Sequence, residues 1–115
     1  GPIGEALAAR QRAEAEARQI HLGLLAALDQ AYSRYQIAQR QVRTFESGLM
    51  KEAESAMKVA EAAYRFGERG ILDYLDAQRV LRKTRVDFLD ARYELQAALL
   101  EIERLRALPP IGEKS

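Results

Sequence analysis

The chain has 115 residues, with 18 basic and 17 acidic side chains and a formal net charge of +1. Nucleic-acid binding by electrostatics needs clustered basic charge, whereas the arginines here are interleaved with Glu and Asp, so we expect no nucleic-acid partner. The chain has no cysteine, which excludes disulfides and thiolate metal sites. No apolar run approaches the roughly 18 residues that a membrane-spanning helix needs, so we expect no membrane span.

The composition predicts long helices. Alanine, the strongest helix former, is abundant, and the only prolines are Pro2, Pro109 and Pro110. We interpret residues 1–2 as the remnant of a protease-cleavage site used in expression, and residues 109–115 as a tail. Residues 3–108 then form one all-α domain with no predicted strand.

Apolar residues of the first half recur in steps of four and three, which is the 3.5-residue repeat of a coiled-coil seam. The pattern passes through Glu52, its one polar interruption, and predicts a helix over residues 4–66. The expected seam residues are Leu24, Leu28, Ala31, Tyr35, Ala38, Val42, Phe45, Leu49, Ala56, Val59, Ala63 and Phe66.

A second run with the same repeat predicts a helix over residues 71–107. Gly67 can close the first helix in the left-handed conformation, and Gly70 can cap the second, with Asp73 favourable in its first turn. Two such helices joined by a turn at residues 67–70 make a long antiparallel, coiled-coil-like hairpin. The seam expected for the second helix comprises Tyr74, Ala77, Leu81, Thr84, Phe88, Ala91, Leu95, Ala98, Ile102 and Leu105.

The two helices are unequal, at roughly 90 Å and roughly 55 Å for a rise of about 1.5 Å per residue. Folded back from the turn, the second helix is expected to reach only Tyr32. The first third of the chain would then lack a partner, although it contains several large apolar residues. Such an overhang predicts self-association. These residues are Ile20, Leu22, Leu24, Leu25 and Leu28.

The second helix also carries apolar residues off its seam, a wider apolar surface than a two-stranded coil needs. That surface fits a helix with neighbours on two sides, in a helical barrel or in the core of a three- or four-helix bundle. The residues are Leu72, Leu75, Val86, Leu89, Tyr93 and Leu100.

Residues 46–48 allow a second interpretation of the first helix. A mid-helix glycine costs only about 1 kcal/mol relative to alanine, so Gly48 permits a kink without forcing one. If the chain reverses there, it forms a three-helix bundle instead of a hairpin.

We expect no enzyme and no cofactor or metal. The only histidine, His21, has no second strong ligand at helical spacing, and with one histidine and no cysteine the usual nucleophile–base arrangements cannot be built. The carboxylates lie beside basic residues, as Glu61 does beside Arg65, and are typical of a solvated helix face.

The turn region resembles the second long hairpin of the TolC-like outer membrane efflux family, which includes the channel subunits of heavy-metal exporters. The similarity covers residues 10–106 and is carried by an aromatic residue, a glycine three residues on, a polar pair, a small residue, and then "hydrophobic-x-Asp-hydrophobic-Leu-Asp-Ala-Gln". Here these positions run from Tyr64 through Gly67 to Gln78. Gly70, where several drug-efflux members have Thr, and the sequence Asp76-Ala77-Gln78-Arg79 look more like the metal-exporter branch.

In this family three protomers build a β-barrel in the outer membrane and an α-helical barrel in the periplasm. The far end of the helices, the tip, docks with a periplasmic adaptor protein that joins the channel to an inner membrane pump. The resemblance implies that this chain is a hairpin fragment from the periplasmic part of a Gram-negative outer membrane protein. The residues carried over are Gly67, Glu68, Arg69 and Gly70 as the adaptor-docking tip, and Tyr64, Asp73 and Asp76 as candidates for gating the tunnel.

Two other functions stay open at this point: the hairpin of an adaptor protein from the same kind of pump, and a generic coiled-coil scaffold. In the scaffold, Gly67 and Gly70 only make the turn and Asp73 only caps a helix.

Overall fold

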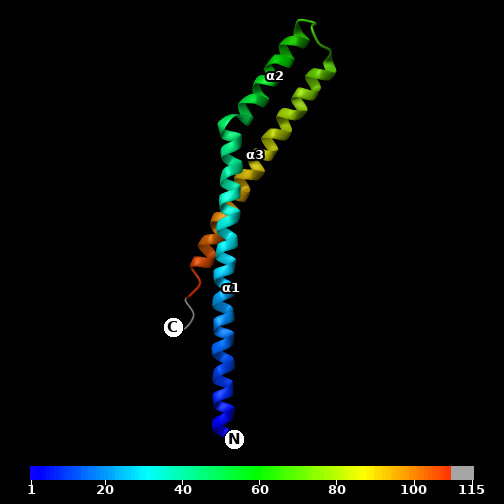
Figure 1. Ribbon diagram of the computed structural model, residues 1–115. Coiled ribbons are helices and arrows are strands. Elements are labelled where there is room, and N and C mark those ends of the chain that lie inside the picture. The colour runs from blue at the N-terminus through cyan, green and yellow to red at the C-terminus, as the bar shows by residue number, and fades with distance from the viewer. Residues whose placement is uncertain (110–115) are drawn as a thin grey trace.

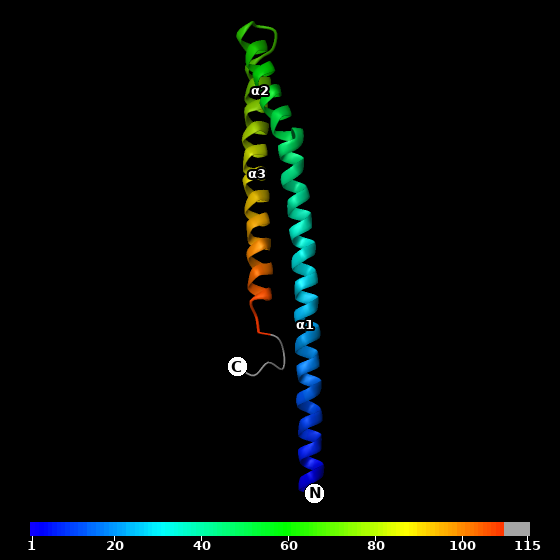
Figure 2. The ribbon, with the colours of Figure 1, turned by 90° about the vertical axis from the view of Figure 1, so that its left-hand side faces the viewer.

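The computed structural model describes residues 1–109, which form helices α1 (Pro2–Thr44), η1 (Phe45–Leu49), α2 (Met50–Arg65) and α3 (Ile71–Arg106) (Figure 1). The first three follow one another in a single bent rod, here called the first arm, and α3 runs back beside it (Figures 1 and 2). The longest dimension is 94 Å. The predicted antiparallel hairpin is confirmed, and the three-helix bundle is wrong because the chain bends at η1 without reversing. Residues 110–115 of the expected tail lie outside the described residues.

The helix ends follow simple capping chemistry. α1 begins at Pro2, two residues earlier than expected. Proline is tolerated at the first position of a helix because the backbone N–H that it lacks would have no hydrogen-bond partner there. The carbonyl of Gly1 accepts the amide of Glu5 at 3.0 Å. At its other end α3 closes at Arg106, and the Ala107 amide donates to the Glu103 carbonyl at 3.0 Å.

The interface between the first arm and α3 is built largely of small side chains. Most buried residues are alanines, which allow the two helices to approach closely, and larger residues gather at the open end of the hairpin. There Ala31, Ile102 and Leu105 form a cluster. The seam predicted for α3, and that predicted for α1 up to Phe45, are confirmed. The buried residues are Ala31, Ala38, Val42, Ala53, Ala60, Ala63, Leu81, Ala91, Ala98, Ile102 and Leu105.

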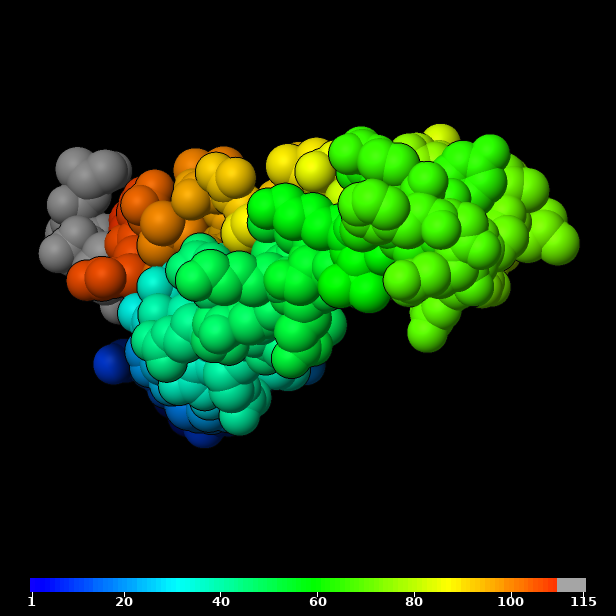
Figure 3. All heavy atoms as spheres, turned by 90° about the horizontal axis from the view of Figure 1, so that it is seen from above, coloured from blue at the N-terminus to red at the C-terminus, as the bar shows by residue number. Residues whose placement is uncertain are grey.

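The bend in the first arm lies in the π-helical segment η1. Gly48 leaves the helical conformation, with φ 176° and ψ −30°. Two hydroxyls donate to backbone carbonyls beside it, Thr44 to Arg40 at 3.0 Å and Ser47 to Thr44 at 3.2 Å, and such bonds favour a bend. Figure 3, viewed from above the turn, shows the turn displaced to one side of the N-terminal half.

The π turn also shifts the seam of the first arm. Beyond η1 the buried residues are Ala53, Ala60 and Ala63, whereas Val59 and Phe66 are 63% and 75% exposed. Of the seam residues predicted from Leu49 onward, Ala63 is buried as expected, whereas the prediction was wrong for Leu49, Ala56, Val59 and Phe66, which are exposed. A π turn takes more residues than an α turn, so the apolar pattern resumes out of phase with an uninterrupted repeat.

The bend lengthens the path of the first arm as well. Tyr64 stacks on Tyr74 and Phe45 stacks on Phe88, so each stacked pair lies at one height along the rod. The segment from Phe45 to Tyr64 therefore covers the same length of the rod as the shorter segment from Tyr74 to Phe88. The first arm uses roughly one helical turn more over this length. For this reason α3 reaches further than expected.

The end of α3 packs as far along the first arm as Leu24 and Leu28, which are half-buried against the cluster of Ala31, Ile102 and Leu105. The prediction that these two leucines lack a partner was wrong. Residues 2–23, the overhang, extend beyond the end of α3 (Figure 2), and Ile20 and Leu22 within it are 65% and 64% exposed.

Candidate functional site at the turn

The turn at residues 67–70 is held by backbone hydrogen bonds that form a Schellman motif. Gly67 takes the left-handed conformation, φ 74°, as expected. Its amide donates to the Tyr64 carbonyl at 3.1 Å, and the amides of Glu68 and Arg69 both donate to the Ala63 carbonyl, at 2.8 and 3.2 Å. Since the backbone satisfies itself, the turn needs no side chain to hold its shape.

Gly70 is the N-cap of α3, with extended φ −78° and ψ 171° and no side-chain cap. Asp73 lies in the first turn of α3, where a carboxylate is favourable near the positive end of the helix. Glu68, Arg69 and Asp73 are exposed, and within residues 1–109 none of them forms an ion pair. Their charges remain available to another molecule.

Behind the turn an aromatic pair links the two arms. The rings of Tyr64 and Tyr74 stack with centroids 5.6 Å apart and planes 22° from parallel. Gln78 Nε2 donates to the Tyr74 hydroxyl at 3.1 Å in a half-buried position. The pair fixes the arms against each other just below the turn.

The three gating candidates therefore do not form one cluster. Tyr64 is held by Tyr74, Asp76 pairs with Arg79, and no hydrogen bond or ion pair within the described part of the chain joins Tyr64 to either Asp73 or Asp76. Sequence reasoning placed Tyr74 only in the seam and missed its role as the partner of Tyr64. The available signal was a tyrosine at a similar distance on each side of the turn.

Two large apolar residues flank the charged turn. Phe66 is 75% exposed and Leu72 is 77% exposed. Phe66 was expected in the buried seam, and the phase shift at η1 brings it to the surface instead. Exposed apolar side chains beside two charged residues, Glu68 and Arg69, are typical of a surface that contacts another protein. We call residues 66–72 the tip.

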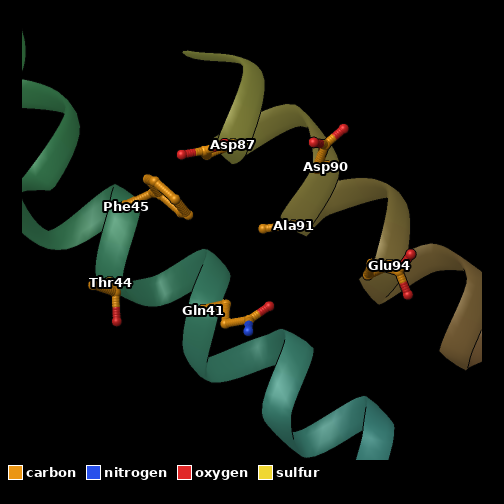
Figure 4. Close-up of a pocket in the computed structure, with 7 residues that line it drawn as sticks. All are labelled: Gln41, Thr44, Phe45, Asp87, Asp90, Ala91 and Glu94. Carbon is orange, nitrogen blue, oxygen red and sulfur yellow. The ribbon is translucent and has the colours of Figure 1, made fainter. Parts of the chain in front are cut away.

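A hollow of about 410 Å³ lies between α1 and α3 beside η1 (Figure 4). Its floor includes Phe45 and Ala91, and the carboxylates of Asp87, Asp90 and Glu94 follow one side of α3. Within the described residues no group of three or more His, Cys, Asp or Glu side chains is placed to hold a metal ion. The hollow is an open groove between two helices.

Two further features concern the rest of the rod. His21 is exposed on the overhang, beside Ala17, Arg18 and Leu22. None of the helices formed by residues 1–109 combines the length and the apolar character needed to cross a membrane.

The chain matches the outer membrane efflux protein family over residues 3–107. The matched region includes both arms of the hairpin and the tip, so the chain belongs to the outer membrane efflux protein family. This family comprises channel components of transport systems and is not an enzyme family. No curated protein and no solved structure gave a significant match.

Proposed function

We propose that this hairpin forms part of the periplasmic wall of an outer membrane efflux channel and that its tip docks to the periplasmic adaptor of a tripartite pump in a Gram-negative cell. The proposal rests on the turn, whose shape does not depend on its exposed side chains. Its backbone is closed by its own hydrogen bonds, while Phe66, Glu68, Arg69 and Leu72 are exposed at one end of a 94 Å rod. Docking residues on such a turn can change without loss of the fold.

The glycines serve the docking in two ways. Gly67 supplies the left-handed turn, and no heavy atom outside its immediate neighbours lies within 4 Å of the position that a Cβ would occupy there. A partner backbone can therefore come close to Gly67 and Gly70.

The glycine at position 70 favours the heavy-metal exporter branch of the family over the drug-efflux branch.

For gating, we propose different roles for the three candidates. The stack of Tyr64 on Tyr74 makes the end of the hairpin move as one body. Asp73 is exposed and has no ion-pair partner in residues 1–109, so it is the carboxylate that bonds a neighbouring helix in the closed tunnel. Asp76 supports this position through its ion pair with Arg79.

We also propose that the chain self-associates. The overhang exposes Ile20 and Leu22, and the face of α3 turned away from the first arm exposes further large apolar residues. Light scattering at micromolar concentration should detect oligomers. A monomer at all concentrations tested would contradict this part of the proposal.

The test of docking is the binding of a purified adaptor hairpin to the chain. Gly67→Arg, and the double charge reversal Glu68→Arg/Arg69→Glu, should each weaken binding roughly tenfold, or ~1.4 kcal/mol. Gly67→Asn is the matched control, because asparagine tolerates the left-handed conformation with a small side chain, and it should bind nearly as well as the native chain.

Three outcomes separate the candidate functions. Unchanged binding for both tip variants would contradict docking at the tip. Binding to an outer membrane channel instead of an adaptor would indicate an adaptor hairpin. A generic scaffold would bind neither protein.

A further inference from the structure

The overhang continues the coiled-coil seam of the first arm beyond the end of α3 (Figure 2). Ile3 and Leu7 on this seam are 87% and 55% exposed, and Ile20 beside it is 65% exposed. The two charged residues of the seam lie together in its middle, with mostly apolar or small residues on both sides. Counted back from Leu24 in steps of three and four, the seam comprises His21, Ala17, Glu14, Arg10, Leu7 and Ile3.

Arg10 and Glu14 form an ion pair within the overhang. Arg10 Nε lies 3.1 Å from Oε1 of Glu14, and the two side chains are 78% and 53% exposed. Their spacing of four residues places a positive and a negative group next to each other on the seam. A second copy that sets its own Glu14 on Arg10, and its own Arg10 on Glu14, completes a network of alternating charges.

The order of these two charges determines the direction of a second copy. In a parallel pair each seam residue meets its own copy, so Arg10 faces Arg10 and Glu14 faces Glu14. Like charges in facing positions are destabilising. In an antiparallel pair Arg10 faces Glu14 on both sides of the two-fold axis. Charge complementarity therefore favours antiparallel overhangs, with the two tips at opposite ends.

The same charges also determine the register of the antiparallel pair. With Arg10 opposite Glu14, the flanking residues meet so that large apolar side chains lie opposite smaller or polar ones. Beside the two-fold axis Ala13 faces Ala13 of the second copy, and small side chains there allow the helices to approach closely. The remaining facing pairs are Leu7 with Ala17, Ile3 with His21, and Ala6 with Ile20.

The neighbouring antiparallel registers, shifted by one heptad, fit less well. One of them places Leu7 opposite Leu24, although Leu24 already packs against the end of α3 in its own hairpin. The other places Leu7 opposite Arg10 and leaves the part of the overhang beyond Glu14 without a partner. The register with Arg10 opposite Glu14 pairs residues 3–21 and avoids the surface that α3 covers.

We infer that the overhang of one chain binds the overhang of a second copy as an antiparallel, two-fold symmetric pair centred on Arg10 and Glu14. This inference rests on the self-association proposed above and is independent of docking at the tip. The contact is isologous, because both copies contribute the same face, so it closes at two chains. Both tips remain free, at opposite ends of the dimer.

The test reverses one charge of the pair at a time. All chains carry Leu89→Glu and Tyr93→Glu, at exposed positions, so that the apolar face of α3 does not contribute. Arg10→Glu leaves only carboxylates at the centre of the contact, and Glu14→Arg leaves only guanidinium groups. Arg12→Glu is the matched control, because it makes the same charge change about 200° around the helix from Arg10.

Size-exclusion chromatography with light scattering measures the outcome. The starting chain and Arg12→Glu should dimerise, whereas Arg10→Glu and Glu14→Arg should each raise the Kd of the dimer at least roughly tenfold. An equimolar mixture of these two variants should dimerise, and so should the Arg10→Glu/Glu14→Arg double variant, because opposite charges again face each other. Circular dichroism should show equal helix content throughout, since every substituted position is exposed.

Three results would overturn the inference. If Arg10→Glu dimerises as well as the starting chain, the seam of the overhang is not the contact. If the mixture dimerises while the starting chain and the double variant do not, the overhangs pair in the parallel direction. If no chain in this set dimerises, the overhang does not bind its copy, although oligomers of the native chain would still support self-association.

Small-angle X-ray scattering measures the direction of the two copies. The centre of the contact lies about 15 Å from the start of α1, so two rods of 94 Å joined through their overhangs should have a longest dimension of about 160 Å. A value close to that of a single rod would overturn the antiparallel arrangement.

Binding of the adaptor hairpin separates this contact from docking at the tip. The monomeric Arg10→Glu chain should bind the adaptor hairpin as well as the dimer does, because its tip is unchanged. Dimerisation without adaptor binding would contradict only tip docking, and adaptor binding without dimerisation of the starting chain would contradict only the overhang contact.

Discussion

Two glycines interrupt the helical path of the first arm, and only one of them reverses the chain. At Gly67 the backbone enters the left-handed region, φ 74°, and three backbone hydrogen bonds close the turn. At Gly48 the backbone is extended, φ 176°, and the helix resumes after a bend. The residues that follow explain the difference: Gly70 ends the turn after Gly67, whereas Met50 and Lys51 favour helix after Gly48. Glycine permits an interruption of the helix, and the residues that follow it determine whether the chain reverses or only bends.

The largest effect is expected at the turn. Gly67→Val should lower the free energy of unfolding by about 2 kcal/mol, since the left-handed conformation costs a residue with a Cβ roughly 1–2 kcal/mol and a β-branched one the most. Chemical denaturation measures the loss, with Gly67→Asn as the control that should cost much less. Equal stability of Gly67→Val and the native chain would show that the left-handed turn is not required.

A smaller effect is expected from the aromatic stacks beside each glycine. Double-mutant cycles on Tyr64 and Tyr74, and on Phe45 and Phe88, should each give a coupling of about 0.5–1.5 kcal/mol. The Phe88 ring also has the Arg92 guanidinium carbon 5.7 Å from its centroid, so the cycle at the bend should be repeated with Arg92→Gln. Zero coupling for Tyr64 and Tyr74 would contradict the proposal that the hairpin end moves as one body.

The effect at Gly48 should have the opposite sign. Gly48→Ala should raise the free energy of unfolding by about 0.5–1 kcal/mol, because alanine favours helix and no heavy atom lies within 4 Å of the added Cβ. The bend should decrease, as read by label distances between α1 and α2. Gly23→Ala in α1 is the matched control, with a similar gain and no change in the bend. A bend unchanged in Gly48→Ala would assign it to the hydroxyls of Thr44 and Ser47.

The smallest effect lies at the open end of the hairpin, far from both glycines. A hydrogen bond of 2.7 Å from Arg104 holds the pKa of Glu101 below its usual value. A lowered pKa in the folded state stabilises the fold above the unfolded pKa, and this contribution is lost as the pH falls through the folded value. Both groups are exposed, so the effect on stability should be slight. Arg104→Gln should raise the pKa of Glu101 in an NMR titration, and an unchanged pKa would contradict the assigned cause.

Much of the hairpin could be predicted from the sequence because heptad spacing depends only on local geometry. The α3 seam and the Gly67 turn illustrate this, since each follows from residues within a few positions. The phase of the first arm beyond η1 could not be predicted, because a π turn leaves no distinct residue pattern. The local signs of the shift were Gly48, which permits a kink, and Glu52, the polar interruption of the expected seam. Because of the same shift, Phe66 was predicted in the buried seam and was not included in the predicted tip.

We propose that the tip, and no other part of the rod, docks to a periplasmic adaptor. Site-specific photo-crosslinking measures this most directly. With a photoreactive amino acid at Glu68, at Ser33 on the outward face of the first arm, or at Arg12 on the overhang, the chain is irradiated with a purified adaptor hairpin. Docking at the tip predicts a covalent adduct from position 68 and none from positions 33 and 12. Adducts from 33 or 12 without one from 68 would contradict it.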